Sequence, residues 1–376
     1  MNKIYFDNAA TTKMSPDVIE VMHQVMQTDF GNPSSIHSYG RTARTIIEKS
    51  RKTVAEILNA STGEIFFTSS ATESNNMAIF RSVIDLGVRR IITSATEHPC
   101  VLNSVKSVHE HHPEVEIAIL DVDQHGELDL EHLEKILSSS DQKTLVSIMH
   151  GNNEIGTMHD IKAISKICSE HSALYHCDTV QTIGKFQLDL QDLNINFLSG
   201  SGHKIYGPKG VGIIYVNQDN MINAMLKGGG QERQLRSGTE NVYGIAGFAK
   251  ALELLDHNKT EHNQQVTLLR KYLKEELVKH VHGVAFNGAK GNNYLPHVLN
   301  LSIPKSEKTE LIMFNLDING ICASAGSACS SGTEQQSHVL NAIRCPQNRK
   351  SLRFSLCPQN TTDEIDVVVS KLKEII

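Results

Sequence analysis

Tryptophan is absent, and aromatic residues are scarce, with 8 Tyr and 11 Phe in 376 residues, so the core must be mainly aliphatic. The net charge of −6 offers no basic surface for nucleic acid, and we expect no direct nucleic-acid binding. No apolar run approaches the ~20 residues that a membrane-spanning helix needs, so we expect no membrane association. The chain runs straight into Ile4-Tyr5-Phe6 without the apolar stretch of a secretory signal.

Paired cysteine motifs are also missing. The 7 cysteines are an odd number with no C-x-x-C pair, which excludes a dense disulfide framework and predicts no metal site. We therefore expect reduced thiols and a cytoplasmic protein. The sequence contains no G-x-G-x-x-G or Walker A motif, which disfavours a simple nucleotide-binding fold despite Gly228-Gly229-Gly230.

Short apolar strands alternate with amphipathic helices through the first two thirds of the chain. Strand-like runs lie at 64–69, 90–95, 115–120, 144–149, 174–178, 195–199 and 210–216. Helical spacing appears in 41–58 and 159–172. This alternation predicts an α/β fold with a mostly parallel sheet that helices cover on both faces. Ligands then bind at the carboxyl ends of the strands.

The last third of the chain predicts a smaller α+β domain. A helix near 265–280 precedes short strands around 297–303, 320–323 and 350–356, and a helix closes the chain near 362–375. The polar stretch 256–265 marks either a hinge between domains or the polar start of one long helix. At a loose ~150 residues per domain, this length suggests two domains or three.

An anion site is predicted where the strand at 64–69 ends. Ser70 and Glu73 have the spacing of a capping box and therefore indicate the start of a helix. The free N–H groups and the dipole of a helix N-terminus favour phosphate, and Thr72 adds a hydroxyl. The alternative is a plain helix cap without a ligand.

Two further polar residues follow predicted strands. Asp178 ends an apolar strand, where its carboxylate either binds a cationic ring nitrogen or caps a turn. Lys204 follows Ser199-Gly200-Ser201-Gly202, whose glycines permit a sharp turn and a close ligand. A partly desolvated lysine is a nucleophile toward carbonyls, whereas the alternative is a solvated surface lysine. An anion site, an acid and an amine together suit pyridoxal phosphate (PLP).

Motifs along essentially the whole chain resemble those of cysteine desulfurases of the NifS/IscS type, which belong to the class-V aminotransferases of PLP fold-type I. The N-terminal and central motifs are Asp7-Asn8-Ala9-Ala10-Thr11-Thr12, Gly31-Asn32-Pro33-Ser34-Ser35, Ala71-Thr72-Glu73-Ser74, Thr96-Glu97-His98 and Asn152-Asn153-Glu154-Ile155-Gly156. The later motifs are Ser201-Gly202-His203-Lys204-Ile205-Tyr206-Gly207-Pro208-Lys209-Gly210, Gly228-Gly229-Gly230-Gln231-Glu232-Arg233, Arg236-Ser237-Gly238-Thr239, Gly326-Ser327-Ala328-Cys329 and Arg353-Phe354-Ser355.

The resemblance implies a role for each matched residue. Lys204 carries PLP as a Schiff base and moves a proton, Asp178 pairs with the ring nitrogen, and His98 stacks on the ring as a catalytic residue. The remaining cofactor contacts are Ala71, Thr72, Ser201 and His203 at the phosphate, Gln181 at the phenolic oxygen, and Thr239 from the other subunit of a homodimer. Asn153, also assigned to the cofactor site, binds the substrate carboxylate together with Arg353.

Cys329 distinguishes this chemistry from transamination. It lies in the small-residue segment Ala325-Gly326-Ser327-Ala328-Cys329-Ser330-Ser331-Gly332, which we expect to be an exposed loop. The resemblance implies that its thiolate attacks the sulfur of L-cysteine, leaving alanine and a persulfide on Cys329. The alternative from the sequence is a spare surface cysteine.

The resemblance also implies the domain division and the partners. A large PLP-binding domain spans 14–258, and a small domain comprises 1–13 and 259–376 with the catalytic-cysteine loop at about 324–336. The mostly parallel sheet of the large domain has seven strands. The sulfur acceptor is an iron–sulfur scaffold or a thiolation relay for a cofactor or tRNA. A selenocysteine lyase or other class-V PLP lyase, and a non-catalytic sulfur-relay or scaffold protein, remain as alternatives.

Overall fold

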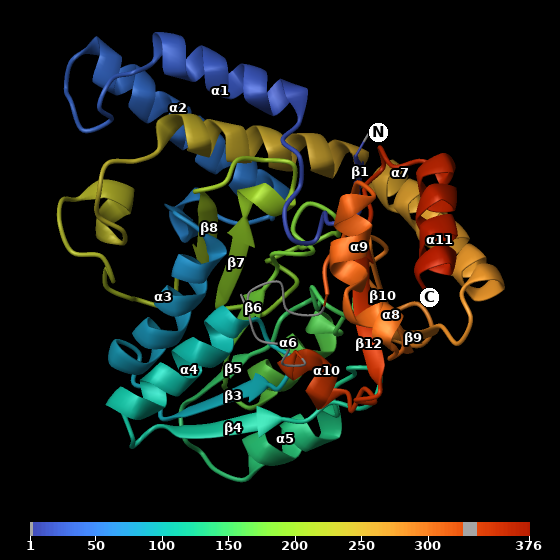
Figure 1. Cartoon of the computed structure of the whole chain (residues 1–376). Helices are drawn as coiled ribbons and strands as arrows, with labels where there is room; N and C mark the ends of the chain where they lie inside the picture. Colours follow the sequence, from blue (N-terminus) through green and yellow to red (C-terminus); the bar gives the residue numbers. More distant parts are fainter. Residues whose placement is uncertain (1–2, 326–336) are drawn as a thin grey trace.

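A mostly parallel sheet of seven strands forms the centre of the molecule in the computed structural model, which describes residues 3–325 and 337–376 (Figure 1). Its strand order is β2-β8-β7-β6-β5-β3-β4. Strand β8 is antiparallel to both of its neighbours, and the other neighbouring pairs are parallel. The strands are β2 (Ile65–Thr68), β3 (Arg90–Ser94), β4 (Glu116–Leu120), β5 (Thr144–Ser147), β6 (Leu174–Asp178), β7 (Phe197–Ser201) and β8 (Gly212–Val216). The predicted fold class and all seven strand segments are confirmed.

Helices cover both faces of this sheet because successive strand residues point to opposite sides. Ile91 belongs to an apolar cluster that includes residues of α3 and α4, whereas its neighbour Ile92 belongs to a cluster that includes residues of α1, α2, α5, α6 and α7. These helices are α1 (Pro16–Thr28), α2 (Ser38–Ile57), α3 (Ala71–Ile84), α4 (Pro99–His111), α5 (Leu130–Ser138), α6 (Ile161–Glu170) and α7 (Val242–His280). Short 3₁₀ helices are η1 (Thr62–Glu64), η2 (Gly202–Lys204) and η3 (Gln231–Gln234).

A second, smaller group of elements packs around its own apolar core. Its strands are β9 (Ala285–Asn287), β10 (Val298–Pro304) and β12 (Arg349–Ser355) in an antiparallel sheet, and β1 (Ile4–Tyr5) parallel to β11 (Ile321–Cys322). Its helices are α8 (Glu307–Glu310), α9 (Ile312–Ile318) and α11 (Thr362–Ile375). Helix α10 (His338–Ala342) packs in a separate small cluster with Val122 and Ile155. The N-terminal residues Ile4 and Phe6 belong to this core.

Helix α7 links the two cores. Its first half, through Leu255, packs into the core of the large sheet, whereas Val266 and later residues pack into the smaller core. The polar stretch 256–265 lies inside this continuous helix, so it is neither a loop hinge nor the start of a helix. Within this stretch Lys259 forms an ion pair with Asp256, and the side chain of His262 is buried.

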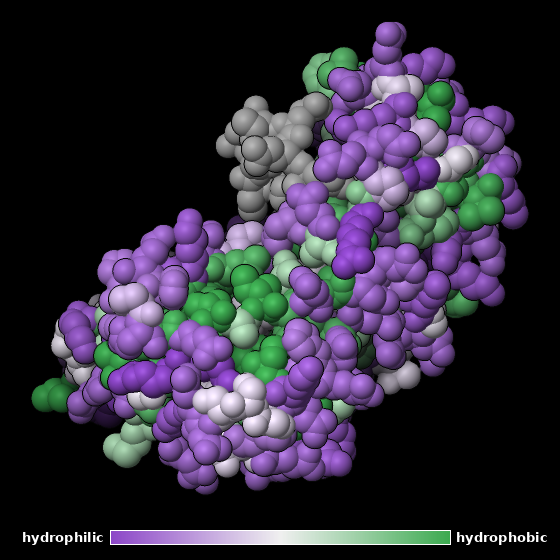
Figure 2. Space-filling view, turned by 90° about the horizontal axis from the view of Figure 1, so that it is seen from below, coloured by the Kyte–Doolittle hydropathy of each residue, from purple (hydrophilic) through white to green (hydrophobic). Residues whose placement is uncertain are grey.

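The surface seen in Figure 2 is mainly hydrophilic, with apolar residues gathered toward the middle of that face. At β4, the last strand in the sheet order, Ile119 leaves 55% of its surface exposed. In the described ranges 3–325 and 337–376, none of the helices combines the length and hydrophobicity that crossing a bilayer requires.

Candidate active site

The register of the sheet brings the predicted cofactor residues to one edge. Thr68 at the end of β2 pairs with Gly212, and Gly212 pairs with Ser201 at the end of β7. Asp178 at the end of β6 pairs with Ser199. The start of α3, Ser201 and Asp178 therefore lie at the carboxyl ends of neighbouring strands, where α/β sheets bind ligands.

The N-terminus of α3 has the cap that the sequence predicts, but only half of the predicted capping box. The Ser70 hydroxyl accepts a hydrogen bond from the Glu73 backbone N–H at 3.3 Å. The Glu73 carboxylate does not accept a hydrogen bond from the Ser70 N–H. Instead it accepts from the Ser69 N–H at 2.8 Å and forms an ion pair with Arg236 at 2.9 Å. Thr72 is exposed in the first turn of this helix, as an anion site requires.

Asp178 is buried and receives two N–H donors. Asn75 Nδ2 on α3 donates to Oδ2 at 2.8 Å, and the Val180 backbone N–H donates to Oδ1 at 2.9 Å. The Asn75 carbonyl faces His176 Nε2 at 3.1 Å, and His176 Nδ1 lies 2.8 Å from the Ser147 hydroxyl. Burial lowers the pKa of His176 to about 4, so this imidazole is neutral and donates to Asn75. This chain of hydrogen bonds fixes the orientation of the Asp178 carboxyl group.

Lys204 ends η2, directly after β7. Its Nζ donates to the carbonyl oxygens of Ala9 at 2.6 Å and Ala10 at 2.7 Å. The turn packs closely, because a Cβ on Gly202 would lie 2.7 Å from the Pro208 carbonyl oxygen. The Lys204 amine is therefore held by two backbone carbonyl oxygens of the N-terminal segment, and it is not a solvated surface lysine.

Gln181 is buried next to this lysine. Its Nε2 donates to the same Ala9 carbonyl oxygen at 3.1 Å, and its Oε1 lies 3.0 Å from His297 Nε2. The N-terminal segment at Ala9 thus connects Gln181 to Lys204.

His98 is the N-cap of α4 and faces both charged groups of the site. Its Nδ1 accepts from the Cys100 backbone N–H at 3.2 Å and lies 2.9 Å from the Cys100 sulfur. Burial lowers the pKa of His98, and the nearby Lys204 cation lowers it further, whereas Asp178 acts in the opposite direction. His98 is therefore a neutral imidazole close to both Lys204 and Asp178.

Arg353 lies at the side of the site formed by the smaller core. Its Nη1 donates to the Asn153 carbonyl oxygen at 3.0 Å, and its Nη2 donates to Asp7 at 2.8 Å. Asp7 also accepts from the Ser324 hydroxyl at 2.7 Å. Arg353 Nε is buried without a partner among the described residues, which leaves a donor for an acid group.

The other predicted residues are less closely grouped. Ala71 and Ser201 are buried, and His203 Nδ1 lies 3.2 Å from the Thr11 hydroxyl, with its pKa lowered to about 4 by burial and by Lys204. Thr239 is exposed between η3 and α7, and within the described ranges no hydrogen bond joins it to the residues above. Cys329 lies outside the described residues.

These residues fit PLP. The exposed start of α3 suits a phosphate, Asp178 is a fixed acceptor for a ring nitrogen, and the Lys204 amine lies at the same edge of the sheet. The unpartnered Arg353 Nε adds an anion donor. Within residues 3–325 and 337–376, no cluster of three or more His, Cys, Asp or Glu side chains suits a metal ion.

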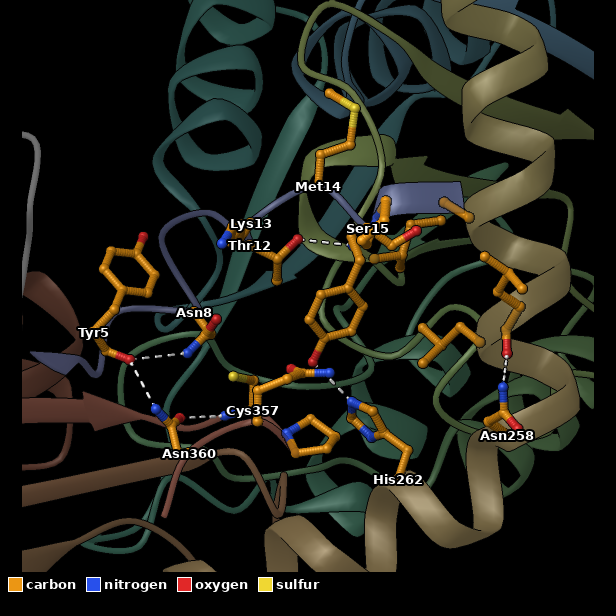
Figure 3. Close-up of a pocket in the computed structure, with 18 of the residues that line it drawn as sticks. Tyr5, Asn8, Thr12, Lys13, Met14, Ser15, Asn258, His262, Cys357 and Asn360 are labelled. Atoms are coloured by element: carbon orange, nitrogen blue, oxygen red, sulfur yellow. Dashed lines mark hydrogen bonds between the residues drawn. The ribbon is translucent and has the colours of Figure 1, made fainter. Parts of the chain in front are cut away.

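A separate cavity of about 950 Å³ lies beside this site and contains none of the predicted cofactor residues. It is lined by the N-terminal segment, α7 and the residues before α11, and Figure 3 shows Tyr5, Thr12, His262 and Asn360 around it.

The fold and the grouping of Lys204, Asp178 and His98 define a PLP-dependent enzyme of fold-type I, in which the cofactor binds to a lysine as a Schiff base. The chain belongs to the aminotransferase class-V family, whose model matches residues 4–368.

Known proteins resemble the chain over its full length. It is 41% identical to "Cysteine desulfurase IscS" of Dictyoglomus turgidum, over 100% of this chain and 94% of that protein. The solved structure of a "NifS-like protein" superposes with a TM-score of 0.91 at 36% identity, covering 99% of both chains. A structure described as "SspA in complex with cysteine" has a TM-score of 0.80 at 32% identity, covering 95% of this chain and 100% of that one.

Sequence reasoning missed several residues that shape the site. Asn75 lies one helical turn after Ala71, so the predicted helix start could have indicated it. Asp7 stands in a motif that carried the resemblance, but without an assigned role. Lys185 and His297 join the site only through tertiary packing, and no local pattern marks them.

Proposed function

We propose that the protein is a cysteine desulfurase, which converts L-cysteine to L-alanine and places the sulfur on Cys329 as a persulfide. The observation that carries the proposal is the grouping of Lys204, Asp178 and His98 in a chain about 40% identical to cysteine desulfurases over its whole length. The relative described in complex with cysteine supports the substrate.

The cofactor roles proposed for these residues come from the family resemblance, and the geometry of the sheet edge supports them. Ala71, Thr72, Ser201 and His203 would hold the phosphate, and Asp178 would bind the ring nitrogen. Gln181 would contact the phenolic oxygen, and Asn153 and His98 would contact the ring. Bound PLP supplies an electron sink that lowers the barrier for removing the Cα proton of an amino acid.

The residues of the chain then place the substrate and move its protons. Arg353 and Asn153 bind the cysteine carboxylate, with the unpartnered Arg353 Nε available for it. The Lys204 amine would act as the general base that takes the Cα proton of the substrate. The neutral His98 imidazole would supply a second proton donor or acceptor next to the cofactor.

The transfer of sulfur from the substrate to Cys329 needs no added oxidant or reductant. The Cys329 thiolate attacks the sulfur of the substrate, the substrate C–S bond breaks, and an S–S bond forms on Cys329. The Cβ atom of the substrate keeps the electron pair of the broken bond and takes up a proton. Cysteine and a protein thiol thus become alanine and a persulfide.

Partners and organisation complete the proposal. A sulfur-acceptor protein, either an iron–sulfur scaffold or a thiolation relay, takes the persulfide sulfur in the cytoplasm. In a homodimer, the exposed Thr239 of each subunit contacts the phosphate of the other. The domains are 14–258, and 1–13 with 259–376; the separate apolar cores on the two halves of α7 support this division.

Alanine release from L-cysteine tests the proposal. We expect alanine from PLP-loaded wild type and almost none from Cys329→Ser, which keeps every cofactor residue. Equal alanine from both proteins would replace this proposal with a lyase that needs no persulfide. Colourless protein that releases no alanine after incubation with PLP would favour a non-catalytic sulfur relay.

A further inference from the structure

Three buried polar side chains form a chain of contacts behind Lys204. Gln181 Oε1 lies 3.0 Å from His297 Nε2, and Lys185 Nζ lies 3.4 Å from the same nitrogen. Each of these residues exposes 4% or less of its surface. None of the sequence motifs includes Lys185 or His297.

The hydrogen on His297 follows from the orientation of Gln181. Gln181 Nε2 faces the Ala9 carbonyl oxygen, which only accepts hydrogen bonds, so the amide nitrogen belongs on that side. Oε1 therefore faces His297, and His297 Nε2 must carry a hydrogen to donate to it. The Nδ1 atom of His297 then holds a lone pair, and it has no partner among the described residues.

The two contacts of His297 Nε2 exclude each other. A nitrogen that donates to Gln181 has no lone pair left to accept a hydrogen bond from a Lys185 ammonium. If Lys185 donated to Nε2, Gln181 would lose its donor, and turning its amide would set Oε1 against the Ala9 oxygen. The orientation of Gln181 therefore requires that Lys185 does not donate to His297.

The electrostatic surroundings favour this arrangement. The charged or titratable groups that face His297 are Lys185, His262, Arg353 and Lys204. All of them are bases, and burial together with these groups lowers the pKa of His297 well below its ordinary value. Burial and the Lys204 cation lower the pKa of Lys185 to about 7, so the neutral amine is readily populated.

We propose that His297 is a positioning residue for the cofactor: its Nε2–H holds the Gln181 amide with the NH2 group toward Ala9 and the ring oxygen of PLP. Lys185 packs against this contact as a neutral amine. The role of His297 rests on the proposed function only in taking PLP as the bound cofactor. The state of His297 is a property of the protein itself.

A direct test is the ¹⁵N spectrum of the histidine side chains in the purified full-length protein. The signals of His297 are identified by their loss in His297→Gln. Glutamine is chosen because its Nε2 takes the position of the imidazole Nε2. We expect His297 as the neutral Nε2–H tautomer throughout the pH range in which the fold is stable. An Nδ1–H tautomer or a doubly protonated ring would overturn the proposal, whether or not the enzyme releases alanine.

The absorbance of bound PLP gives a second readout. The amide N–H donated by Gln181 competes with the hydrogen bond between the protonated Lys204 linkage and the same ring oxygen. In His297→Leu we expect the pH midpoint of this absorbance change to rise by about one pH unit, the value of one hydrogen bond to a charged group. His297→Gln should restore the wild-type midpoint, because its N–H replaces the lost donor.

Two variants serve as controls. His159→Leu replaces another buried histidine, which is outside the site, and should leave the midpoint unchanged. Lys185→Met keeps the bulk without the amine and should also leave it unchanged. The proposal fails if Lys185→Met moves the midpoint as far as His297→Leu, or if His297→Gln does not restore it.

Discussion

At the scale of single residues, the acid of the site depends on a neighbour that carries no charge. Asn75 donates to Asp178 at 2.8 Å and lies 3.1 Å from His176, so its amide has a fixed orientation within the core. Gln181 has the same relation to His297 and Ala9. In both cases a neutral imidazole orients an amide, and the amide presents its N–H groups to the site.

We expect Asn75→Ala to weaken both the fold and cofactor binding. The substitution leaves Asp178 Oδ2 without its side-chain donor, and a hydrogen bond to a charged group is worth roughly 1.5–3 kcal/mol. The free energy of unfolding, from urea titration, and the Kd for PLP are the quantities to measure. Asn76→Ala is the matched control, because the neighbouring Asn76 side chain is exposed at its hydrogen bond to the Thr72 carbonyl and makes no contact with Asp178 among the described residues. Equal effects in the two variants would contradict this role of Asn75.

At the scale of elements, a buried ion pair fixes the segment that leads to Thr239. Arg51 on α2 binds Glu232 in η3 with two contacts of 2.8 and 2.9 Å, and Glu232 also accepts from the Phe67 backbone N–H. Glu232, Arg233 and Gln234 have positive φ values of 43°, 55° and 69°, which side chains other than glycine adopt at a cost. The ion pair compensates for this strained turn.

Glu232→Gln should therefore destabilise the protein by roughly 3–5 kcal/mol, because it leaves the Arg51 guanidinium buried without its full counter-charge. Urea unfolding measures the loss, and hydrogen exchange at residues 231–239 should become faster. Glu56→Gln on α2 serves as the control, since the ion pair of Glu56 with Lys52 is exposed and contributes little to stability. A loss in Glu232→Gln no larger than in this control would refute the role of the pair.

The elements themselves could be predicted well from the sequence, and their long-range contacts could not. Strand segments such as 174–178 show in the apolar runs, and the helix at 362–375 shows in its spacing, because both patterns are local. Only the Ser70 half of the predicted capping box is present, because the distant Arg236 binds the Glu73 carboxylate. Likewise the polar stretch 256–265 gave no sign that α7 continues through it, since partners outside the helix stabilise it.

The same limit applies to the site. Lys204 and Asp178 could be located because polar residues after apolar strands are visible in the sequence, and the register confirms that their strands end at one edge. The acceptors of the Lys204 amine, the carbonyl oxygens of Ala9 and Ala10, were not predictable, because they come from a remote segment of the chain. The donor to Asp178 was within reach, because Asn75 lies one helical turn after the predicted helix start. The roles assigned to Thr239 and Cys329 stay predictions.

At the scale of the whole molecule, buried histidines make stability depend on pH. Burial lowers the pKa of His150, His159, His176, His203 and His262 from about 6.5 to about 4. Between these values the unfolded chain takes up protons that the folded chain does not, so the free energy of unfolding falls as pH decreases. Glu97 opposes this trend, because burial raises its pKa well above the ordinary value.

We expect urea unfolding to show a loss of stability from pH 6.5 down to about 4, with a slope of ~1.4 kcal/mol per pH unit for each proton that only the unfolded chain binds. Above pH 6.5 these histidines contribute no slope. Stability that stays constant or rises on acidification across this window would show that the histidines are solvated or paired in the folded protein.

The central claim for the whole molecule is that sulfur moves from L-cysteine to Cys329. The most direct measurement is a single turnover of PLP-loaded protein with L-cysteine carrying a sulfur isotope, followed by peptide mass spectrometry under conditions that preserve persulfides. The account predicts one labelled sulfur atom on the peptide that contains Cys329, in step with the alanine formed. Alanine formation with the label only in free sulfide, or on another cysteine, would contradict it.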